Sequence, residues 1–263
     1  MYIIKVGGGS TINLKGVVSD LATLERSFLV VLGANALRDD LGLRLGQEKV
    51  QLTSVSGYSS VFSDARAVDL IMMAYSGLSN RRFVEMCQRE GVNAIGLTGL
   101  DGRLVQGRRN RGIKVRENGK TMIKRDFSGK PEKVNAELLT TLLYQGYRPV
   151  LSIPIIDETG FAINSENDDI VAVLQDALKA DKVIQLIEAP GFLEDKNDEG
   201  SMLQTLSASE IKAREASVEG RMKRKMLALG RLVDAGAHEV IISDGRTVHP
   251  VLDALAGKGT TIR

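Results

Sequence analysis

The amino-acid sequence predicts an α/β fold, a three-layer αβα sandwich with a central, mainly parallel sheet and added β-hairpins, as one large domain or two lobes. Short apolar runs rich in β-branched residues alternate with longer runs in which apolar residues recur every three to four positions. Such alternation is typical of a parallel sheet covered on both faces. With 263 residues the chain can bury roughly three quarters of its unfolded surface without disulfide bonds.

The first element is a strand at residues 2–6, where four of five residues are β-branched or aromatic and glycines follow. A helix is expected next, at residues 14–26. Further strands are predicted from similar apolar runs at 28–32, 92–97, 149–153, 182–187 and 239–242. Further helices are predicted from the spacing of Leu, Ile, Val, Met and Ala at 34–45, 64–77, 80–90, 132–145, 167–180 and 219–235.

Two segments interrupt this alternation. Residues 102–130 are basic and punctuated by glycine, which predicts β-hairpins. Residues 194–200 are polar and are expected to form a surface lid or loop.

The basic segment dominates the charge distribution. Residues 103–133 hold eleven basic and three acidic residues, a net charge of +8, and because the whole chain carries +2 the remainder carries −6. A basic protrusion on an acidic body predicts an anionic partner, with a merely solvated hairpin as the competing interpretation. Aromatic residues make up 4% of the chain and Phe127 alone lies near these cations, which disfavours nucleic acid and favours an acidic protein or a polyanionic ligand.

The composition also limits which cellular compartment and which metal cofactors we expect. No apolar stretch approaches the ~20 residues that span a bilayer, and the first residues lack a signal-peptide pattern, so we expect a soluble, cytoplasmic protein without membrane contact. The single cysteine, Cys87, lies in a helical run, is expected to be buried, and fits a reducing compartment. Two histidines without metal-ligand spacing predict no resident metal site, so any metal should be oxygen-bound and arrive with a nucleotide.

The run Lys5-Val6-Gly7-Gly8-Gly9 places a cation beside open backbone amides at a strand-to-helix turn. Amides at a helix N-terminus bind anions, so this turn is a phosphate site or, on the simpler interpretation, only a tight turn. Neither a P-loop nor a G-x-G-x-x-G motif is present.

Three further runs carry polar or charged residues at helix starts. Residues 30–35 repeat the pattern of a strand, a small-residue turn and a helix, and predict a second anion or carboxylate site. Residues 162–169 lead into a helix, where Asn and Asp are natural N-caps. Residues 220–225 place four cations at a helix start, which is unfavourable unless an anion is supplied.

Together these runs resemble the amino acid kinase family, and the resemblance covers the whole chain. It is carried by residues 5–8, 93–103, 220–225 and 244–246. Within the family the chain is most similar to the branch that acts on aminoadipate or glutamate tethered to a small acidic amino-group carrier protein, a relative of N-acetylglutamate kinase.

The resemblance implies an amino-acid kinase or carbamate kinase-like fold and transfer of the γ-phosphoryl group of ATP, with Mg²⁺ carried by the nucleotide, to a side-chain carboxylate. The product is an acyl phosphate of lysine or arginine biosynthesis. Lys5 and Lys225 match the two transition-state lysines, one from each lobe, and Asp168 matches the acid that orients them. Residues 1–165 would form the acceptor-binding lobe and 166–263 the nucleotide-binding lobe.

The other implied site residues fall into three groups. The acceptor pocket comprises Gly33, Ala34, Val61 and Asn164. The phosphate and nucleotide group comprises Gly7, Gly8, Glu188, Gly191 and Lys225. The expected contacts with the acidic carrier protein are Arg108, Arg109, Arg111, Lys114, Lys124 and Arg125. A homodimer through the apolar helix at 64–77 is expected, with core packing as the competing account.

Several positions depart from the family pattern. Leu32-Gly33-Ala34 replaces a His-Gly-Gly turn, Glu188 replaces an aspartate, and Val61 aligns with the arginine that binds the acceptor carboxylate. Arg66 lies one helical turn beyond Val61, and the sequence leaves its direction open. The changes cluster in the acceptor pocket and point to a variant acceptor.

Two alternatives stay open beside the carrier-dependent enzyme. One is a free N-acetylglutamate kinase, disfavoured because a small acceptor gives no reason for the +8 segment. The other is a kinase-fold protein that binds a nucleotide or an acidic partner without turnover, as a regulatory or sensor module.

Overall fold

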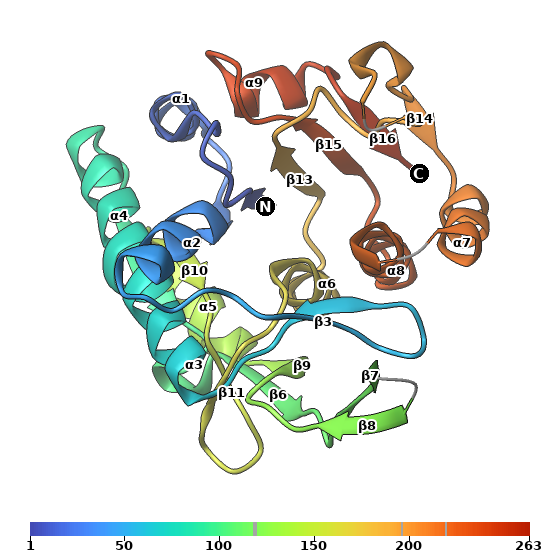
Figure 1. Cartoon of the computed structure of the whole chain (residues 1–263). Coiled ribbons are helices and arrows are strands. Elements are labelled where there is room, and N and C mark those ends of the chain that lie inside the picture. The colour runs from blue at the N-terminus through green and yellow to red at the C-terminus, as the bar shows by residue number, and fades with distance from the viewer. Residues whose placement is uncertain (118–119, 196, 219) are drawn as a thin grey trace.

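The computed structural model describes residues 1–117, 120–195, 197–218 and 220–263. Its centre is an eight-stranded sheet of order β14-β16-β15-β13-β1-β2-β10-β5 (Figure 1). Six of these strands run parallel, whereas β16 is antiparallel to β15 and pairs in parallel with β14. The strands are β1 (Tyr2–Val6), β2 (Phe28–Leu32), β5 (Ala94–Thr98), β10 (Arg148–Ser152), β13 (Lys182–Ile187), β14 (Thr205–Leu206), β15 (Val240–Asp244) and β16 (Thr260–Ile262).

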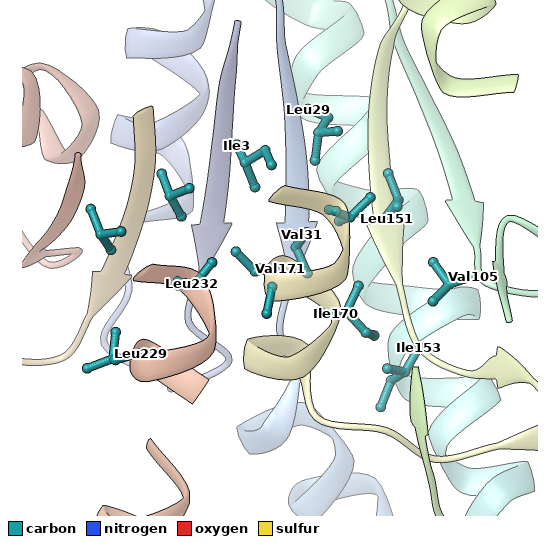
Figure 2. Packing of buried hydrophobic residues seen from close by; sticks show 14 of the residues in the cluster. Ile3, Leu29, Val31, Val105, Leu151, Ile153, Ile170, Val171, Leu229 and Leu232 are labelled. Atoms are coloured by element: carbon teal, nitrogen blue, oxygen red, sulfur yellow. The ribbon is translucent and has the colours of Figure 1, made fainter. Parts of the chain in front are cut away.

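Helices cover both faces of the sheet, because successive side chains of a strand point to opposite sides. Ile4 of β1 packs in a buried cluster with residues of α1 (Leu14–Thr23), α4 (Asn80–Arg89) and α9 (Pro250–Leu255). Its neighbour Ile3 packs in a second cluster on the opposite face, with residues of α6 (Asn167–Leu178) and α8 (Gly220–Asp234). Figure 2 shows this second cluster, with α6 and α8 lying across the strands. The predicted three-layer α/β sandwich is confirmed.

The other helices and the small sheets complete the chain. The helices are α2 (Asn35–Arg44), α3 (Ala65–Ile71), a π-helix η1 (Met72–Ser79), α5 (Ala136–Tyr144), α7 (Ala208–Ser217) and the short 3-10 turns η2 (Asp101–Arg103) and η3 (Glu199–Ser201). One small sheet has the order β12-β11-β6-β9, and β3-β4 and β7-β8 are two-stranded. Their strands are β3 (Gln51–Thr53), β4 (Ser59–Val61), β6 (Val105–Arg109), β7 (Ile113–Glu117), β8 (Lys120–Lys124), β9 (Gly129–Val134), β11 (Ile155–Ile156) and β12 (Ala162–Ile163).

The basic segment forms the predicted hairpins, in which β6 pairs antiparallel with β9 and β7 with β8. The prediction of a helix start at residue 132 is wrong, because Glu132 and Lys133 belong to β9 and the helix begins only after Asn135, whose side chain accepts from the amide of Leu138. The spacing of apolar residues that predicts α5 continues into the preceding strand β9. The N-cap residue, Asn135, sets the start of the helix.

The predicted break between helices 64–77 and 80–90 is also wrong. Residues 65–89 form one continuous helical segment, with the π-helix η1 at its centre. Tyr75 of η1 packs in the same buried cluster as Ile3, whereas Phe83 of α4 packs on the opposite face of the sheet. The helical segment therefore contributes to the hydrophobic clusters on both faces of the sheet. Its apolar residues change face along the segment, and for this reason the spacing of apolar residues suggests two separate helices.

Cys87 is buried in α4 as expected, and burial raises the pKa of its thiol to about 12. Among the described residues, no helix combines the length and the hydrophobicity that a membrane span requires. The division of the chain at 165/166 falls directly before α6, although the central sheet is continuous across it because β1 pairs with β13.

Candidate active site

The carboxyl ends of three central strands meet at one edge of the sheet. In the parallel register Val6 of β1 lies opposite Leu32 of β2 and Leu186 of β13, so the turns that follow these strands come together. In open α/β sheets, ligands bind at this edge. The edge carries Lys5 and its glycines, the Gly33 turn and Glu188.

Two glycine turns touch here at backbone distance. A Cβ atom at Gly8 would lie 2.5 Å from the amide nitrogens of Ala34 and Asn35, and one at Gly33 would lie 2.6 Å from the amide nitrogen of Gly8. Side chains at Gly8 and Gly33 are therefore excluded by packing. The contact brings the turn after β1 against the N-terminus of α2, where backbone amides favour an anion.

A cavity of about 390 Å³ opens at this point. Its wall includes the predicted residues Lys5, Gly7, Gly8, Gly33, Val61, Asn164, Asp168, Glu188 and Lys225. The structure thus gathers residues from both ends of the chain around one space. Gly191 lies outside this wall and packs against Thr260 and Met202. Ala34 does not line the cavity either; it is 4% exposed, and its amide lies at the contact with Gly8.

The charged centre of the cavity is formed by two lysines and one aspartate. The ammonium of Lys5 donates a hydrogen bond to the carboxylate of Asp168 in the first turn of α6. Burial acts to raise the pKa of the Asp168 carboxyl, but the charges of Lys5 and Lys225 outweigh it and the pKa is lowered. Asp168 is therefore an anion between two cations.

Lys225, on α8, completes this centre from the other half of the chain. Burial and the charge of Lys5 lower the pKa of its ammonium to about 8, while Asp168 acts in the opposite direction. The side chains of Arg221 and Arg224, which belong to the same predicted basic run, lie outside the described residues.

Glu188, at the end of β13, accepts hydrogen bonds from the amide and the hydroxyl of Thr11, at 2.9 and 2.6 Å. These bonds lower the pKa of its carboxyl. A Cβ atom at Gly9 would lie 1.9 Å from this carboxylate, so glycine is needed for the carboxylate to lie against the turn. The third glycine of the opening motif thus has a packing role.

The opposite wall comes from the β3-β4 hairpin and the polar run before α6. Val61 ends β4, and the side-chain amide of Asn164 donates to the hydroxyl of Ser63 at 2.9 Å. Ser165 and Asn167 also line the cavity. The hydroxyl oxygen of Ser165 and the side-chain oxygen of Asn167 are buried and accept or donate no hydrogen bond within the part of the chain that the structure describes.

Several residues in or beside the cavity wall escaped the sequence analysis. They are Thr11, which holds Glu188, and Arg38, Lys49 and Tyr75, which line the cavity. The hydroxyl of Tyr75 donates to the side chain of Asn35, and burial raises its pKa to about 12, so the phenol is neutral. Arg38 and Tyr75 lie inside helical segments, and neither carries a local sequence signal for a place in the cavity wall.

The predicted carrier contacts divide into two sets. Arg108 pairs with Glu132 at 3.0 Å, and Arg109 stacks on Phe127, 3.7 Å from the ring centroid. The second set consists of side chains that are exposed and form no ion pair with a described residue. Its members are Arg111, Lys114 and Arg125. Lys124 is half-buried at the end of β8.

The basic hairpin lies next to the cavity wall. The backbone amide of Val55, in the β3-β4 turn, donates to the carbonyl of Lys114 at 2.8 Å, and Ser54 forms a bridge with Val115. The same β3-β4 hairpin supplies Ser59, Ser60 and Val61 to the wall. Figure 1 shows β3 running between α6 and the β7-β8 hairpin. A partner bound to the hairpin would stand beside the cavity.

The described residues contain no group of three or more His, Cys, Asp or Glu side chains placed to hold a metal ion. The cavity wall carries four basic side chains, Lys5, Arg38, Lys49 and Lys225, and four acidic ones, Asp39, Glu166, Asp168 and Glu188. Its ammonium groups and the backbone amides at the start of α2 suit phosphate oxygens.

The sequence model of the amino acid kinase family matches residues 1–244. The chain belongs to the amino acid kinase family. This family member is 39% identical over 269 aligned residues to a protein of Thermus thermophilus named LysW-aminoadipate kinase, and the match covers 100% of both chains. The family predicted from the sequence motifs is thereby confirmed.

Solved structures of low sequence identity share the fold of this family member. The N-acetylglutamate synthase of Neisseria gonorrhoeae matches 99% of the chain with a TM-score of 0.78 at 20% identity, over 58% of that longer chain. The carbamate kinase of Giardia matches 99% of the chain and 97% of its own, with a TM-score of 0.67 at 16% identity. The predicted carbamate kinase-like fold is confirmed.

Proposed function

We propose that the chain transfers the γ-phosphoryl group of ATP to the side-chain carboxylate of 2-aminoadipate, or of glutamate, attached to an acidic amino-group carrier protein. The product is an acyl phosphate, the activated form of a carboxylate before reduction, as lysine or arginine biosynthesis requires. The name of the Thermus thermophilus relative, which covers the whole chain, supports this substrate class.

The observation that carries the proposal is the meeting of Lys5, Asp168 and Lys225 in one cavity where the two glycine turns touch. Phosphoryl transfer demands that two mutually repelling anions be held in line and that charge on the equatorial oxygens be neutralised. Two ammonium groups from opposite halves of the chain can do this from two sides. Asp168 holds them in position and does not react.

The phosphate chain of ATP would lie against the Gly7-Gly8 turn, beside Glu188 and Lys225. The amide of Gly7 already donates to the carbonyl of Leu186 at 2.9 Å, so the donor that this turn offers to phosphate is the amide of Gly8. Mg²⁺ would arrive bound to the nucleotide, because the cavity offers cations and amides and no cluster of carboxylates among the described residues. When bound, the metal supplies neutralisation of phosphate charge. Gly191 would contact the nucleotide outside this cavity wall, beside Thr260 and Met202.

The acceptor would enter from the side of the β3-β4 hairpin, between Val61 and Asn164, with Gly33 and Ala34 at its reactive end. The carrier protein would dock on the basic hairpin through the cations at 108–125, with Arg111, Lys114 and Arg125 as the exposed members. In this arrangement residues 1–165 bind the acceptor and residues 166–263 bind the nucleotide. A dimer would use the helix at 65–79, whose Met73 and Leu78 are 48% and 41% exposed.

A hydroxamate assay tests the proposal. Purified protein, ATP and magnesium are incubated with carrier-linked aminoadipate, carrier-linked glutamate or free N-acetylglutamate, and the acyl phosphate is trapped with hydroxylamine. We expect the carrier-linked acceptors to react far faster than N-acetylglutamate. Preference for free N-acetylglutamate would assign the chain to that kinase instead, and ATP binding without any trapped product would favour a non-catalytic binding protein.

A further inference from the structure

We infer that Arg38 of α2 binds the carboxylate that the acceptor keeps, the α-carboxylate of its amino-acid moiety. This inference rests on the proposed function and adds the residue that decides which acceptors fit. It starts from the fact that the cavity has cations at two separate places. Lys5 and Lys225 stand with Asp168 at the transfer end, and Arg38 and Lys49 stand with Asp39 elsewhere on the wall.

The position of α2 sets the spacing between these places. The helix begins at Asn35, whose amide lies at the Gly8 contact, and Arg38 follows three residues later. Three residues of α-helix advance about 4.5 Å along the axis. The backbone of Arg38 therefore stands slightly less than one helical turn beyond the phosphate-binding amides, and its side chain lines the same cavity as Lys5. A ligand with one carboxylate at the transfer end can place a second carboxylate at Arg38.

The burial of Arg38 is unusual for a charged residue. It is 8% exposed, and arginine is almost never buried to this extent unless it is paired. Its Nε and one terminal nitrogen donate to the same oxygen of Asp39, at 3.0 and 2.6 Å. The other terminal nitrogen has no hydrogen bond to a described residue. This nitrogen is available to a ligand in the cavity.

The local charge balance also leaves one cation in excess. Asp39 is shared between Arg38 and Lys49, and although burial acts to raise the pKa of its carboxyl, the hydrogen bonds and charges of these two cations lower it. Asp39 is thus an anion held by two cations, and the cluster carries a net charge of +1. The neighbouring Tyr75 is neutral, and Glu166, which also lines the cavity, is a further acidic side chain whose charge acts on Tyr75.

Arg38 supplies the one guanidinium among the described side chains of this wall. Val61, which lines the same cavity and a smaller one of about 80 Å³ beside it, is aliphatic and cannot bind a carboxylate. Arg66 of α3 is exposed and lines neither cavity. A guanidinium presents parallel donors that fit a carboxylate, which an ammonium does not. Arg38 therefore fits an α-carboxylate better than Lys49 does.

The test is a comparison of Arg38→Met with the wild type, using the acceptor that reacts best in the hydroxamate assay. The acceptor is prepared with its α-carboxylate free or as the α-carboxamide. For the wild type we expect the carboxamide to raise KM by about 10- to 100-fold, the range expected when a hydrogen bond to a charged group is lost. For Arg38→Met we expect a similar increase with the free carboxylate and no further penalty from the carboxamide.

Methionine keeps the apolar stem of the side chain, and Lys49 still pairs with Asp39 in this variant. Arg44→Met, on the same helix and 69% exposed, is the matched control and should leave both acceptors unchanged. ATP affinity and the thermal midpoint show whether each variant is folded. A double variant, Arg38→Met with Val61→Arg, returns a guanidinium to the same cavity and should recover part of the discrimination.

The outcomes separate the two proposals. If the wild type phosphorylates none of the acceptors, the proposed function is refuted, and this inference is refuted with it. If the wild type reacts but a folded Arg38→Met still discriminates between carboxylate and carboxamide as the wild type does, only the role of Arg38 is overturned. Arg38 would then serve to hold Asp39 and Lys49 in place.

Discussion

The ammonium of Lys5 is ion-paired with the carboxylate of Asp168, and this pair connects the carboxyl end of strand β1 to the first turn of α6. Lys225 forms no ion pair with a carboxylate of the described residues, and Lys5 lies close enough to lower the pKa of its ammonium. The charge of Lys5 is thus neutralised by Asp168, whereas the charge of Lys225 is only partly neutralised. An incoming phosphate is the partner that such an arrangement lacks.

Replacing Lys225 by alanine should abolish most of the transfer. We expect acyl-phosphate formation to fall by about 10²- to 10³-fold, by analogy with removal of one donor from a preorganised anion site. Lys212→Ala, at an exposed position of α7 that pairs with Asp234, removes the same charge far from the cavity and should keep full activity. A folded Lys225→Ala protein with nearly native rates in the hydroxamate assay would contradict the assignment.

The pH dependence of the reaction should report Lys225. Its pKa is lowered from 10.5 to about 8, so the ammonium is charged below pH 8 and loses its proton above it. Because kcat/KM for ATP follows the free enzyme, we expect it to be level below pH 8 and to decrease above this value. Asp168→Asn removes the group that raises this pKa, so the decrease should begin at lower pH. A profile that stays level to pH 10 would show that Lys225 is not required in its charged form.

Charge reversal on the basic hairpin should affect the carrier and spare the nucleotide. We expect Arg111→Glu with Arg125→Glu to raise KM for the carrier-linked acceptor about tenfold or more at low salt, because steering charges act through association and are screened by ions. KM for ATP should not change. Lys15→Glu, an exposed position on α1, is the matched control. Equal effects of salt on carrier and ATP would argue against docking at this hairpin.

Gly8→Ala tests the contact between the two glycine turns. The added methyl group would lie 2.5 Å from two backbone nitrogens, so the turns must separate. We expect a loss of roughly 1 to 3 kcal/mol in the free energy of unfolding and weaker ATP binding. At Gly230 in α8 an added Cβ atom would lie 4.0 Å from Ile211, so Gly230→Ala should be neutral or stabilising because alanine favours helix. Denaturant titrations of both variants provide the comparison, and an unchanged midpoint for Gly8→Ala would refute the close approach.

The sequence carries enough information for the central strands and for the transfer residues. β13 has the predicted bounds, and Lys5, Asp168 and Lys225 do meet. Both successes depend on local signals, an uninterrupted apolar run and motifs of a known family. β16 and β14 were not predicted, because two- and three-residue strands are defined by their partners across the sheet and not by their own pattern.

Arg38 illustrates what a local argument misses. In sequence it is one of several charged residues in a helix of ordinary composition, and nothing marks it as buried. Its burial follows from the way α2 packs between Gly8 and the continuous helix at 65–89, a relationship between segments that only the folded chain defines. Tyr75 escaped for the same reason, since the π-helix that presents it has no pattern of its own.

The pairing of β1 with β13 has a consequence for how the protein is made. Strand β1 lies at the centre of the sheet, and its partner β13 follows about 180 residues later in the chain. Until residues 182–187 leave the ribosome, one edge of β1 stays unpaired, and exposed strand edges invite association with other chains. Contacts of such long sequence separation also slow folding. Nascent chains that stall before this strand are therefore the species in which aggregation should concentrate.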